Sequence, residues 1–352
     1  MSKQSPGRGL ERSQVARRPS GRLATWPAET TIVLGVIGDP VRHSLSPVLH
    51  NAALRELGLD WVYVAFPVPS GRGREAVSAM PDLGIRGLSV TMPHKAAAAA
   101  ACHRLTPLAE RLGVVNTVTN IAGSLVGDST DGPGFLDSLE ELGWRAEGKR
   151  CLVLGAGGSA RAVVLSLAEA GAARVAVVAR RQDEALSVSG LGGRAGLVSS
   201  VEAAEEAELI VNATPVGMTG ADAEPRDELP LGLEAKRLGP GQLVADLIYA
   251  PAATPLLLAA RSRGAKTCNG LGMLIHQAAR QLRNWTGRDA PVEVMSAAVL
   301  RELRRRSGPR PRSERGRQIL ERDARAGAGP AASGPIAIPS STSHTKLPKK
   351  LQ

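Results

Sequence analysis

Apolar and polar positions alternate along the chain in a pattern that predicts strands followed by helices. The apolar run TIVLGVIGDP ends in Gly and Pro, which is typical of a strand and its turn. The next segment, SPVLHNAALRELG, predicts a helix with Ser46 as N-cap, Pro47 in the first turn and Gly58 as its stop. The alternation continues with the predicted strands WVYVAFPV and IRGLSVTM and the predicted helices GREAVSAMPDLG and AAAAAA.

A hairpin and a second alternating series follow. GVVNTVTNIAGSLVGDST predicts two short strands joined by a turn, and DGPGFLDSLEELG predicts a helix. From residue 149 the predicted strands are KRCLVLGAGG, ARVAVVAR, ELIVNATPVGM and QLVADLIYA, and the predicted helices are SARAVVLSLAEAG, SVEAAEEA, TPLLLAARSRG and LGMLIHQAARQLRNWTG. This alternation favours the α/β class, with parallel sheets covered by helices. A length of 352 residues suggests about two domains.

The net charge of +11 comes from the two ends of the chain. Residues 1–29 hold six basic and two acidic side chains, and residues 301–352 hold thirteen and four, so the remainder carries −2. Both ends are rich in Arg, Gly, Pro and Ser, a composition that cannot bury enough apolar surface to offset the entropy of ordering. We therefore expect disordered basic tails over 1–29 and 305–352. Weak contact of these tails with anions or nucleic acid is the alternative, and nucleic acid is not expected as a partner of the folded part.

Cys102, Cys151 and Cys268 are far apart, odd in number and match no metal-binding spacing. They are expected to be buried, reduced thiols of a cytoplasmic protein rather than a disulfide framework. No apolar run approaches the roughly 20 residues that span a bilayer, and the first residues lack the apolar segment of a signal peptide. The six histidines form no metal-binding arrangement, and His94 is expected at the surface. Neither a metal nor a membrane is therefore expected as a partner.

A nucleotide-binding fingerprint, G-x-G-x-x-A, follows the predicted strand that begins at residue 149 and opens a predicted helix. It consists of Gly155, Ala156, Gly157, Gly158, Ser159 and Ala160. Glycines allow the backbone to approach a pyrophosphate, and the helix N-terminus offers unpaired N–H groups. An ordinary tight turn is the alternative, but the position between strand and helix favours dinucleotide binding.

Arg180 and Arg181 end the next predicted strand, where an NAD-binding domain has an acidic residue for the ribose hydroxyls. A guanidinium group suits a 2′-phosphate, because it forms forked, charge-assisted hydrogen bonds. The pattern therefore favours NADP over NAD as the cofactor. A solvated basic turn is the alternative interpretation.

Lys95 stands where the strand IRGLSVTM passes through Pro93 into the alanine helix. The positive end of the helix macrodipole disfavours an ammonium there, so this lysine is expected to exchange its proton more readily than a surface lysine. Such a group serves as a general acid or base when a partner holds it, and Asp131 in STDGPGF is a candidate partner. The alternative is a surface lysine at a helix start.

Seven ordered motifs resemble the shikimate dehydrogenase family over roughly residues 32–290: GVIGDPVRHSLSPVLHNAAL, SVTMPHK, GVVNTV, STDGPGF, GAGGSARA, NATPVGM and NGLGMLIHQAA. The resemblance implies an N-terminal α/β substrate domain over 30–131, completed by a returning helix at 271–300, and a Rossmann-type, doubly wound NADP domain over 132–270. It also implies the reversible NADPH-dependent reduction of 3-dehydroshikimate to shikimate, on the route to chorismate and the aromatic amino acids. The protein is expected to be a monomer or homodimer.

The same resemblance implies the site residues. Lys95 and Asp131 match the catalytic pair, in which Lys95 donates a proton to the ketone oxygen and Asp131 orients it. The matches to substrate contacts are Ser44 and Ser46 for the carboxylate, together with Thr91, Asn116, Tyr249 and Gln277. The cofactor matches are Gly155, Ala156, Gly157, Gly158 and Ser159 for the phosphates, Arg180 for the 2′-phosphate, and Leu247, Gly270 and Met273 near the nicotinamide, with the loop 212–218 beside the cofactor. From the residues alone, Ser46 is also explained as a helix cap, Asn116 as a turn residue and Gln277 as a solvent-facing side chain.

The chain also departs from the family pattern. Ser89 and Ser129 stand where the family commonly has Asn, Met92 replaces a usual Val, and Ala179 replaces a usual Asn that contacts the adenosine. The last change removes that contact with the adenosine of NADP. Two alternatives stay open: a quinate/shikimate dehydrogenase with a different substrate or NAD preference, and a nonenzymatic dinucleotide-binding regulator whose basic tails engage nucleic acid.

Overall fold

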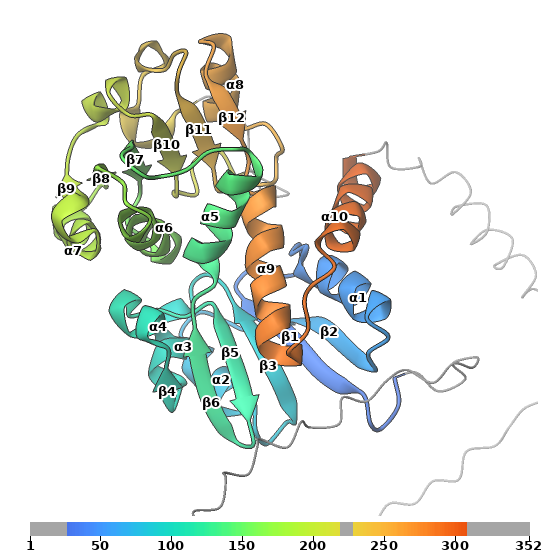
Figure 1. Ribbon diagram of the computed structural model, residues 1–352. Coiled ribbons are helices and arrows are strands. Elements are labelled where there is room, and N and C mark those ends of the chain that lie inside the picture. The colour runs from blue at the N-terminus through green and yellow to red at the C-terminus, as the bar shows by residue number, and fades with distance from the viewer. Residues whose placement is uncertain (1–26, 219–227, 308–352) are drawn as a thin grey trace, which may run out of the picture. The chain divides into compact units, whose positions relative to one another are not determined.

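The computed structural model describes residues 27–218 and 228–307 (Figure 1). Most of both predicted tails therefore lies outside the described residues. One part of the predicted C-terminal tail is folded, because helix α10 runs over Val292–Ser307 and includes the arginine-rich segment 301–306. Its apolar positions Met295 and Val299 are fully buried, which explains why this charged segment is ordered.

The first of two six-stranded sheets has the order β2-β1-β3-β5-β6-β4. Its strands are β1 Ile32–Gly38, β2 Trp61–Pro67, β3 Ile85–Val90, β4 Arg104–Leu105, β5 Thr117–Ile121 and β6 Ser124–Asp128. β1 is parallel to β2 and β3, whereas β5 is antiparallel to β3 and β6. The expected parallel arrangement therefore holds for β1, β2 and β3, whereas the predicted hairpin is inserted into this sheet and reverses the direction of β5.

Helices α1 Ser46–Glu56, α2 Gly73–Ser78, α3 Lys95–Ala101 and α4 Pro107–Leu112 connect these strands. The prediction that Ser46 is the N-cap of α1 is wrong. Leu45 occupies the cap position with helical backbone angles, and Ser44 Oγ instead accepts a hydrogen bond from the Ser46 N–H at 3.2 Å. The predicted stop is confirmed, because Gly58 has φ +64° just after the helix.

Helix α9, Leu271–Thr286, packs on the first sheet although it follows the second sheet in sequence. Its Trp285 is buried, and the indole Nε1 donates to Val118 O at 3.2 Å. An added Cβ at Gly87 would lie 2.4 Å from this Nε1, so only glycine allows the helix to approach β3 so closely. Helix α9 thus packs against the sheet formed by the N-terminal part of the chain.

The second sheet is entirely parallel and has the order β12-β11-β10-β7-β8-β9. Its strands are β7 Arg150–Leu154, β8 Arg174–Val178, β9 Gly196–Val198, β10 Leu209–Asn212, β11 Leu243–Asp246 and β12 Lys266–Cys268. Counted from β7, this is the 3-2-1-4-5-6 order of the dinucleotide-binding fold, with its switch point between β7 and β10.

The helices of this half are α5 Asp131–Glu141, α6 Gly158–Glu169, α7 Gln182–Leu191 and α8 Pro255–Ser262. The segment SVEAAEEA forms a 3₁₀ helix over Val201–Glu205 rather than a longer helix. Helices α5 and α9 run side by side (Figure 1). Two glycines of α5 permit close packing: an added Cβ at Gly132 would lie 2.0 Å from Ser166 Oγ of α6, and one at Gly134 would lie 2.5 Å from Gln277 N of α9. This packing fixes the start of α5, where Asp131 stands.

Candidate active site

Lys95 and Asp131 are in contact. The Lys95 ammonium donates a hydrogen bond to Asp131 Oδ2, and both side chains are largely shielded, at 16% and 10% exposed. Lys95 is the first residue of α3, where a cation is unfavourable, and Asp131 is the first residue of α5, where an anion is favourable. The acid therefore compensates the positive charge that the helix start would otherwise repel. This geometry supports the interpretation of Lys95 as a held group rather than a surface lysine.

Two side-chain amides surround the Asp131 carboxylate. Asn116 Nδ2 donates to Asp131 Oδ1 at 2.7 Å and approaches Gln277 Oε1 at 3.3 Å. Asn116 is 3% exposed and Gln277 8% exposed, so the interpretation of the glutamine as a solvent-facing residue does not hold. The four predicted residues form one polar cluster of an ammonium, a carboxylate and two carboxamides.

Strand direction explains why residues so far apart in sequence gather here. The register pairs Ser89 with Thr117 and Thr117 with Asp128. The end of β3, the start of the antiparallel β5 and the end of β6 therefore lie at the same edge of the sheet. Lys95 follows the end of β3, Asn116 precedes the start of β5, and Asp131 follows the end of β6. The reversal of β5 thus brings Asn116 to the site.

The other predicted substrate contacts lie at different positions around this edge. Ser44 and Ser46 stand at the start of α1, joined by the hydrogen bond described above. Thr91 directly follows β3 and is half-buried, with its N–H bonded to Ile37 O at 3.0 Å. Tyr249 is half-buried in the loop after β11 and packs against the core around α1 and α9.

The predicted phosphate loop lies between β7 and α6. Gly155 has φ +116°, which explains the glycine, and Gly157 is the N-cap of α6 without any side-chain cap. The first N–H groups of a helix have no intrahelical partners. An added Cβ at Gly157 would meet no described protein atom within 4 Å, so the loop is open at this point. These features fit an incoming pyrophosphate.

The loop also contacts Lys95. Its ammonium donates to Ser159 Oγ at 3.3 Å, and an added Cβ at Gly158 would lie 3.0 Å from Lys95 Cδ. The predicted acid/base group and the predicted phosphate loop are therefore neighbours, although 64 positions separate them in sequence.

Arg180 is exposed just beyond β8, next to the phosphate loop, since the Gly155 N–H bonds to Val178 O at 2.7 Å. Within 27–218 and 228–307, its guanidinium has no hydrogen bond or ion pair, whereas the neighbouring Arg181 pairs with Glu184. Of the two arginines, Arg180 is therefore the one whose guanidinium is not engaged by a described residue and can donate hydrogen bonds to a phosphate.

Leu247 and Gly270 meet at the end of the second sheet. The Gly270 N–H bonds to Ile248 O at 3.0 Å, and an added Cβ at Gly270 would lie 2.0 Å from Leu247 O. Only glycine therefore fits at position 270. Met273 is buried in the first turn of α9, in the core that includes β7 and β10.

A buried cluster at the ends of β10 and β11 was not predicted from the sequence. Asn212 Nδ2 donates to Asp246 Oδ1 at 3.0 Å, and Thr254 Oγ1 donates to Asp246 Oδ2 at 2.7 Å. Burial raises the pKa of Asp246, and its hydrogen bonds from Thr254, Ile248 and Asn212 oppose this shift. The cluster anchors the loops that begin at 212 and 247. The motif NATPVGM contains Asn212, but the sequence predicted only a loop there and not the role of Asn212 in anchoring that loop.

His94 is 2% exposed, and its Nε2 donates to Val68 O at 2.8 Å. The expectation of an exposed histidine is therefore wrong. The physical reason is that α2 lies against it: an added Cβ at Gly73 would sit 2.7 Å from His94 Nδ1. His94 thus supports the turn before Lys95 rather than standing in solvent.

All three cysteines are free thiols, with Cys151 buried and Cys102 and Cys268 half-buried. Burial raises the pKa of Cys151 to about 12 and the pKa of Cys102 and of Cys268 to about 11. At neutral pH these thiols are protonated and unreactive. Within 27–218 and 228–307, no group of three or more His, Cys, Asp or Glu side chains is arranged to hold a metal ion.

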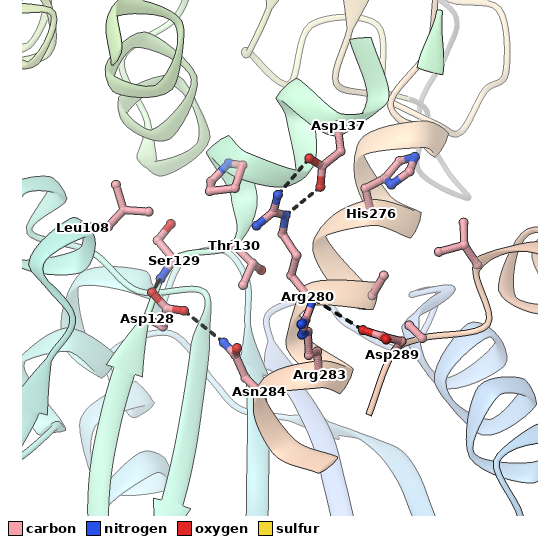
Figure 2. Close-up of a pocket in the computed structure, with 14 residues that line it drawn as sticks. Leu108, Asp128, Ser129, Thr130, Asp137, His276, Arg280, Arg283, Asn284 and Asp289 are labelled. Carbon is pink, nitrogen blue, oxygen red and sulfur yellow. Dashed lines mark hydrogen bonds and ion pairs between the residues drawn. The ribbon is translucent and has the colours of Figure 1, made fainter. Parts of the chain in front are cut away.

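A cavity of about 590 Å³ lies on the flank of α5 and α9 (Figure 2). Several of its polar groups are paired with one another: Arg280 forks onto Asp137 at 2.6 and 2.8 Å, and Asn284 donates to Asp128 at 3.0 Å. The predicted site residues do not line it; it reaches only Ser129 and Thr130, which precede Asp131. The chemistry therefore does not centre on this cavity.

In the described part of the chain, no helix combines the length and the apolar character needed to cross a bilayer.

Comparison with known proteins identifies relatives of the whole arrangement. Residues 36–118 match the family model of the shikimate dehydrogenase substrate binding domain, and residues 270–300 match that of the shikimate 5′-dehydrogenase C-terminal domain. A shikimate dehydrogenase (NADP(+)) of Methanopyrus kandleri is 45% identical over 288 residues, which cover 79% of this chain and 97% of the relative.

Solved structures agree with this relationship. The shikimate 5-dehydrogenase of Thermus thermophilus, in complex with NADP(H) and shikimate, is 38% identical with a TM-score of 0.69, covering 77% of this chain and 99% of that one. A quinate dehydrogenase of Corynebacterium glutamicum in complex with NAD is 29% identical with a TM-score of 0.68, over 77% and 99% of the two chains. Because the identity to the Methanopyrus kandleri enzyme extends over nearly its whole length, this chain belongs to the shikimate dehydrogenase family.

Proposed function

We propose that this protein catalyses the reversible, NADPH-dependent reduction of 3-dehydroshikimate to shikimate, a step toward chorismate and the aromatic amino acids. The observation that carries the proposal is the Lys95 ammonium, which bonds to the Asp131 carboxylate and to Ser159 of the phosphate loop. This group is in contact with both a polar cluster suited to a polyhydroxylated acid and a loop suited to a dinucleotide.

Lys95 acts as the general acid in the direction of reduction. Negative charge grows on the ketone oxygen as the carbonyl carbon is reduced, and a proton from the ammonium neutralises it. Asp131 holds the ammonium in place through the ion pair and accepts a hydrogen bond from a substrate hydroxyl. General acid–base catalysis of this kind contributes roughly 10²–10⁴-fold to the rate.

Substrate recognition uses polar groups around the edge of the first sheet. Ser44 and Ser46, at the start of α1, donate to the substrate carboxylate. Asn116 and Gln277, whose amides already approach each other at 3.3 Å, bind the ring hydroxyls. Thr91 and Tyr249 complete the set of substrate contacts.

The cofactor that this proposal requires is NADP, which when bound supplies the hydride. The residues that would hold its phosphates are Gly155, Ala156, Gly157, Gly158 and Ser159. The Arg180 guanidinium, which has no hydrogen bond or ion pair to any described residue, would bind the 2′-phosphate. Leu247, Gly270 and Met273 would border the nicotinamide. The open space at Gly157 and the uncapped start of α6 fit this role.

The proposed division of labour follows the two sheets. Residues 30–131 and 271–300 would bind the substrate, and residues 132–270 would bind NADP. The free, high-pKa thiols support a reducing, cytoplasmic setting. Whether the active form is a monomer or a homodimer stays a prediction.

The alternatives are not favoured by the comparisons. Quinate oxidation with NAD is the closest competing activity. The Arg180 guanidinium argues against NAD, because it cannot accept the hydrogen bonds that the ribose hydroxyls of NAD donate. A nonenzymatic regulator has no need of a shielded lysine–aspartate pair. The decisive experiment follows the absorbance of reduced nicotinamide with four mixtures, combining shikimate or quinate with NADP⁺ or NAD⁺. Turnover greatest with shikimate and NADP⁺ is expected, whereas no turnover in any mixture would overturn the proposal.

A further inference from the structure

Gln281 is a buried amide that the proposed catalytic machinery does not use. It lies on α9 one turn after Gln277 and is 1% exposed. Its hydrogen bonds to the first sheet run to Ser89 of β3 and to Asn116 and Thr117 at the start of β5. Such a fully buried amide fixes the orientation of its partners, because leaving a buried donor or acceptor without a hydrogen bond costs free energy.

The orientation of the Gln281 amide follows from its partners. Nε2 lies 3.2 Å from the backbone carbonyl Asn116 O, which can only accept, so this atom is the donor. Nε2 also donates to Thr117 Oγ1 at 3.1 Å. The Thr117 hydroxyl, with its lone pair engaged by Gln281, directs its own proton to Asn116 Oδ1 at 2.8 Å.

The Asn116 amide is oriented by the same reasoning. Its Oδ1 accepts from Thr117 Oγ1 and from the backbone N–H of Thr130, each at 2.8 Å. Its Nδ2 therefore faces Asp131 Oδ1, to which it donates at 2.7 Å. A continuous series of donors therefore runs from Gln281 through Thr117 and Asn116 to the carboxylate that holds Lys95.

The series also continues in the opposite direction. Ser89 Oγ donates to Gln281 Oε1 at 2.7 Å and accepts from Tyr63 Oη at 2.6 Å. Tyr63 is 1% exposed, so this end of the series is also buried. Hydrogen bonds aligned in one direction polarise one another, which strengthens the donor that reaches Asp131.

We propose that Gln281 is a positioning residue that acts through the Thr117 hydroxyl on Asn116, so that Asn116 presents its N–H group to the Asp131 carboxylate that holds Lys95. This inference rests on the proposed function for its consequence in catalysis. Its structural part, the control of Asn116 by Gln281, is independent of turnover.

Gln281→Met keeps the length and shape of the side chain and removes both polar atoms. Thr117→Val removes the hydroxyl at nearly constant volume in a strand, and Thr117→Ser retains it. Each of the first two variants is expected to lower kcat about tenfold, the effect of losing roughly one buried hydrogen bond. Thr117→Ser is expected to stay within about twofold of the unchanged protein, and KM for NADP⁺ is expected to stay constant in all three.

The control is Thr286→Val, which removes another buried hydroxyl of α9. Thr286 Oγ1 donates to Leu282 O at 2.7 Å and has no part in the series. A comparable loss of stability without a loss of kcat is expected. If Thr286→Val lowers kcat as much as Gln281→Met, the effect is general destabilisation of α9 and the inference is wrong.

The double variant Gln281→Met/Thr117→Val tests whether the two residues act in series. Once the hydroxyl is absent, Gln281 keeps its contact with the Asn116 backbone carbonyl but has no hydrogen-bonded route to the Asn116 side-chain amide. The kcat of the double variant is therefore expected within about twofold of Thr117→Val alone. Multiplication of the two losses to about a hundredfold would overturn the inference.

Nuclear magnetic resonance separates this inference from the proposed function. The side-chain amide resonances of Asn116 are expected to shift in Gln281→Met and Thr117→Val but not in Thr117→Ser or Thr286→Val. Unchanged resonances in the first two variants would overturn the positioning role. If the variants show the expected resonance shifts but the unchanged protein turns over no substrate, the proposed function alone is overturned.

Discussion

Lys95 donates a hydrogen bond to the Ser159 hydroxyl over 3.3 Å, and this contact joins the start of α3 to the start of α6. The same ammonium bonds to Asp131 at the start of α5. Three helix starts therefore meet at one cation. Because helix starts attract anions, this arrangement is suited to a substrate or cofactor that brings negative charge to the site.

Removal of the Lys95 ammonium is expected to abolish most of the activity. In Lys95→Ala, kcat for shikimate oxidation should fall at least roughly a hundredfold, because no group remains to move the proton at the reacting oxygen. The alanine extends an existing alanine helix, so the fold should persist. Steady-state kinetics measure the loss, and calorimetry of NADP⁺ binding measures what is retained.

Lys149→Ala is the matched control for this variant, because Lys149 is a half-exposed lysine paired with Glu208 away from the site. It should keep kcat within about twofold. Near-normal turnover of Lys95→Ala would contradict the assigned role.

Gly157→Ala should separate nucleotide binding from stability. An added Cβ meets no described protein atom within 4 Å, and Gly157 has an ordinary φ of −75°, so the only expected cost is about 1 kcal/mol or less of helix capping. The methyl group would nevertheless occupy space over the loop that the pyrophosphate needs. Affinity for NADP⁺, measured by fluorescence titration, should fall at least about tenfold.

Gly239→Ala provides the comparison, because an added Cβ there also meets no described atom within 4 Å. It should leave NADP⁺ affinity unchanged. Equal NADP⁺ affinity of Gly157→Ala and the unchanged protein would show that the loop does not hold the phosphates.

Arg180→Gln should change the preference between the two nicotinamide cofactors. Charge-assisted hydrogen bonds contribute about 1.5–3 kcal/mol, so the dissociation constant for NADP⁺ should rise about 10- to 100-fold. The dissociation constant for NAD⁺, which lacks the 2′-phosphate, should change little. Arg181→Gln is the matched control, since that guanidinium already pairs with Glu184. If Arg181→Gln has the larger effect on NADP⁺, the phosphate is bound by the other arginine.

His50 should make the protein less stable in mild acid. It is fully buried, stacks on Tyr63 with ring centroids 4.3 Å apart, and neither ring nitrogen has a hydrogen-bond partner in the described structure. Burial lowers the pKa of His50 from 6.5 to about 3, and the Gln281 side chain only partly opposes this shift. Between pH 6.5 and 3 the unfolded chain therefore binds a proton that the folded chain refuses, so stability falls as the pH falls through this window.

At pH 5 this linkage costs about 2 kcal/mol of unfolding free energy relative to pH 7. His50→Leu removes the titrating group, so its loss of stability between pH 7 and 5 should be about 2 kcal/mol smaller than that of the unchanged protein. Urea unfolding at both pH values measures the difference, and all other histidines cancel in the comparison. Identical pH dependence of the two proteins would contradict the prediction.

The alternation of apolar runs and amphipathic segments was sufficient to predict most strands and helices, because each period reflects a local burial pattern. It failed where burial is decided from outside the segment. Helix α10 is ordered although its end is rich in arginine, because Met295 and Val299 are covered by the core. His94 is buried because Gly73 lets α2 approach it.

The order of strands could not be read from the sequence. Nothing local shows that β5 is antiparallel to β3, yet this reversal brings Asn116 beside Asp131. Gln281 likewise gave no signal of its own, because a polar residue on a helix is as compatible with solvent as with the buried contacts it makes.

The sequence by itself determined the glycine-rich turn between β7 and α6 and the chemical groups of the candidate site, because glycines at a strand–helix turn and a lysine at a helix start have local physical consequences. Only the tertiary structure decided which of those groups touch. The contacts of Lys95 with Asp131 and Ser159 depend on sheet register and on glycine-mediated helix packing, and both are set by segments far apart in the chain.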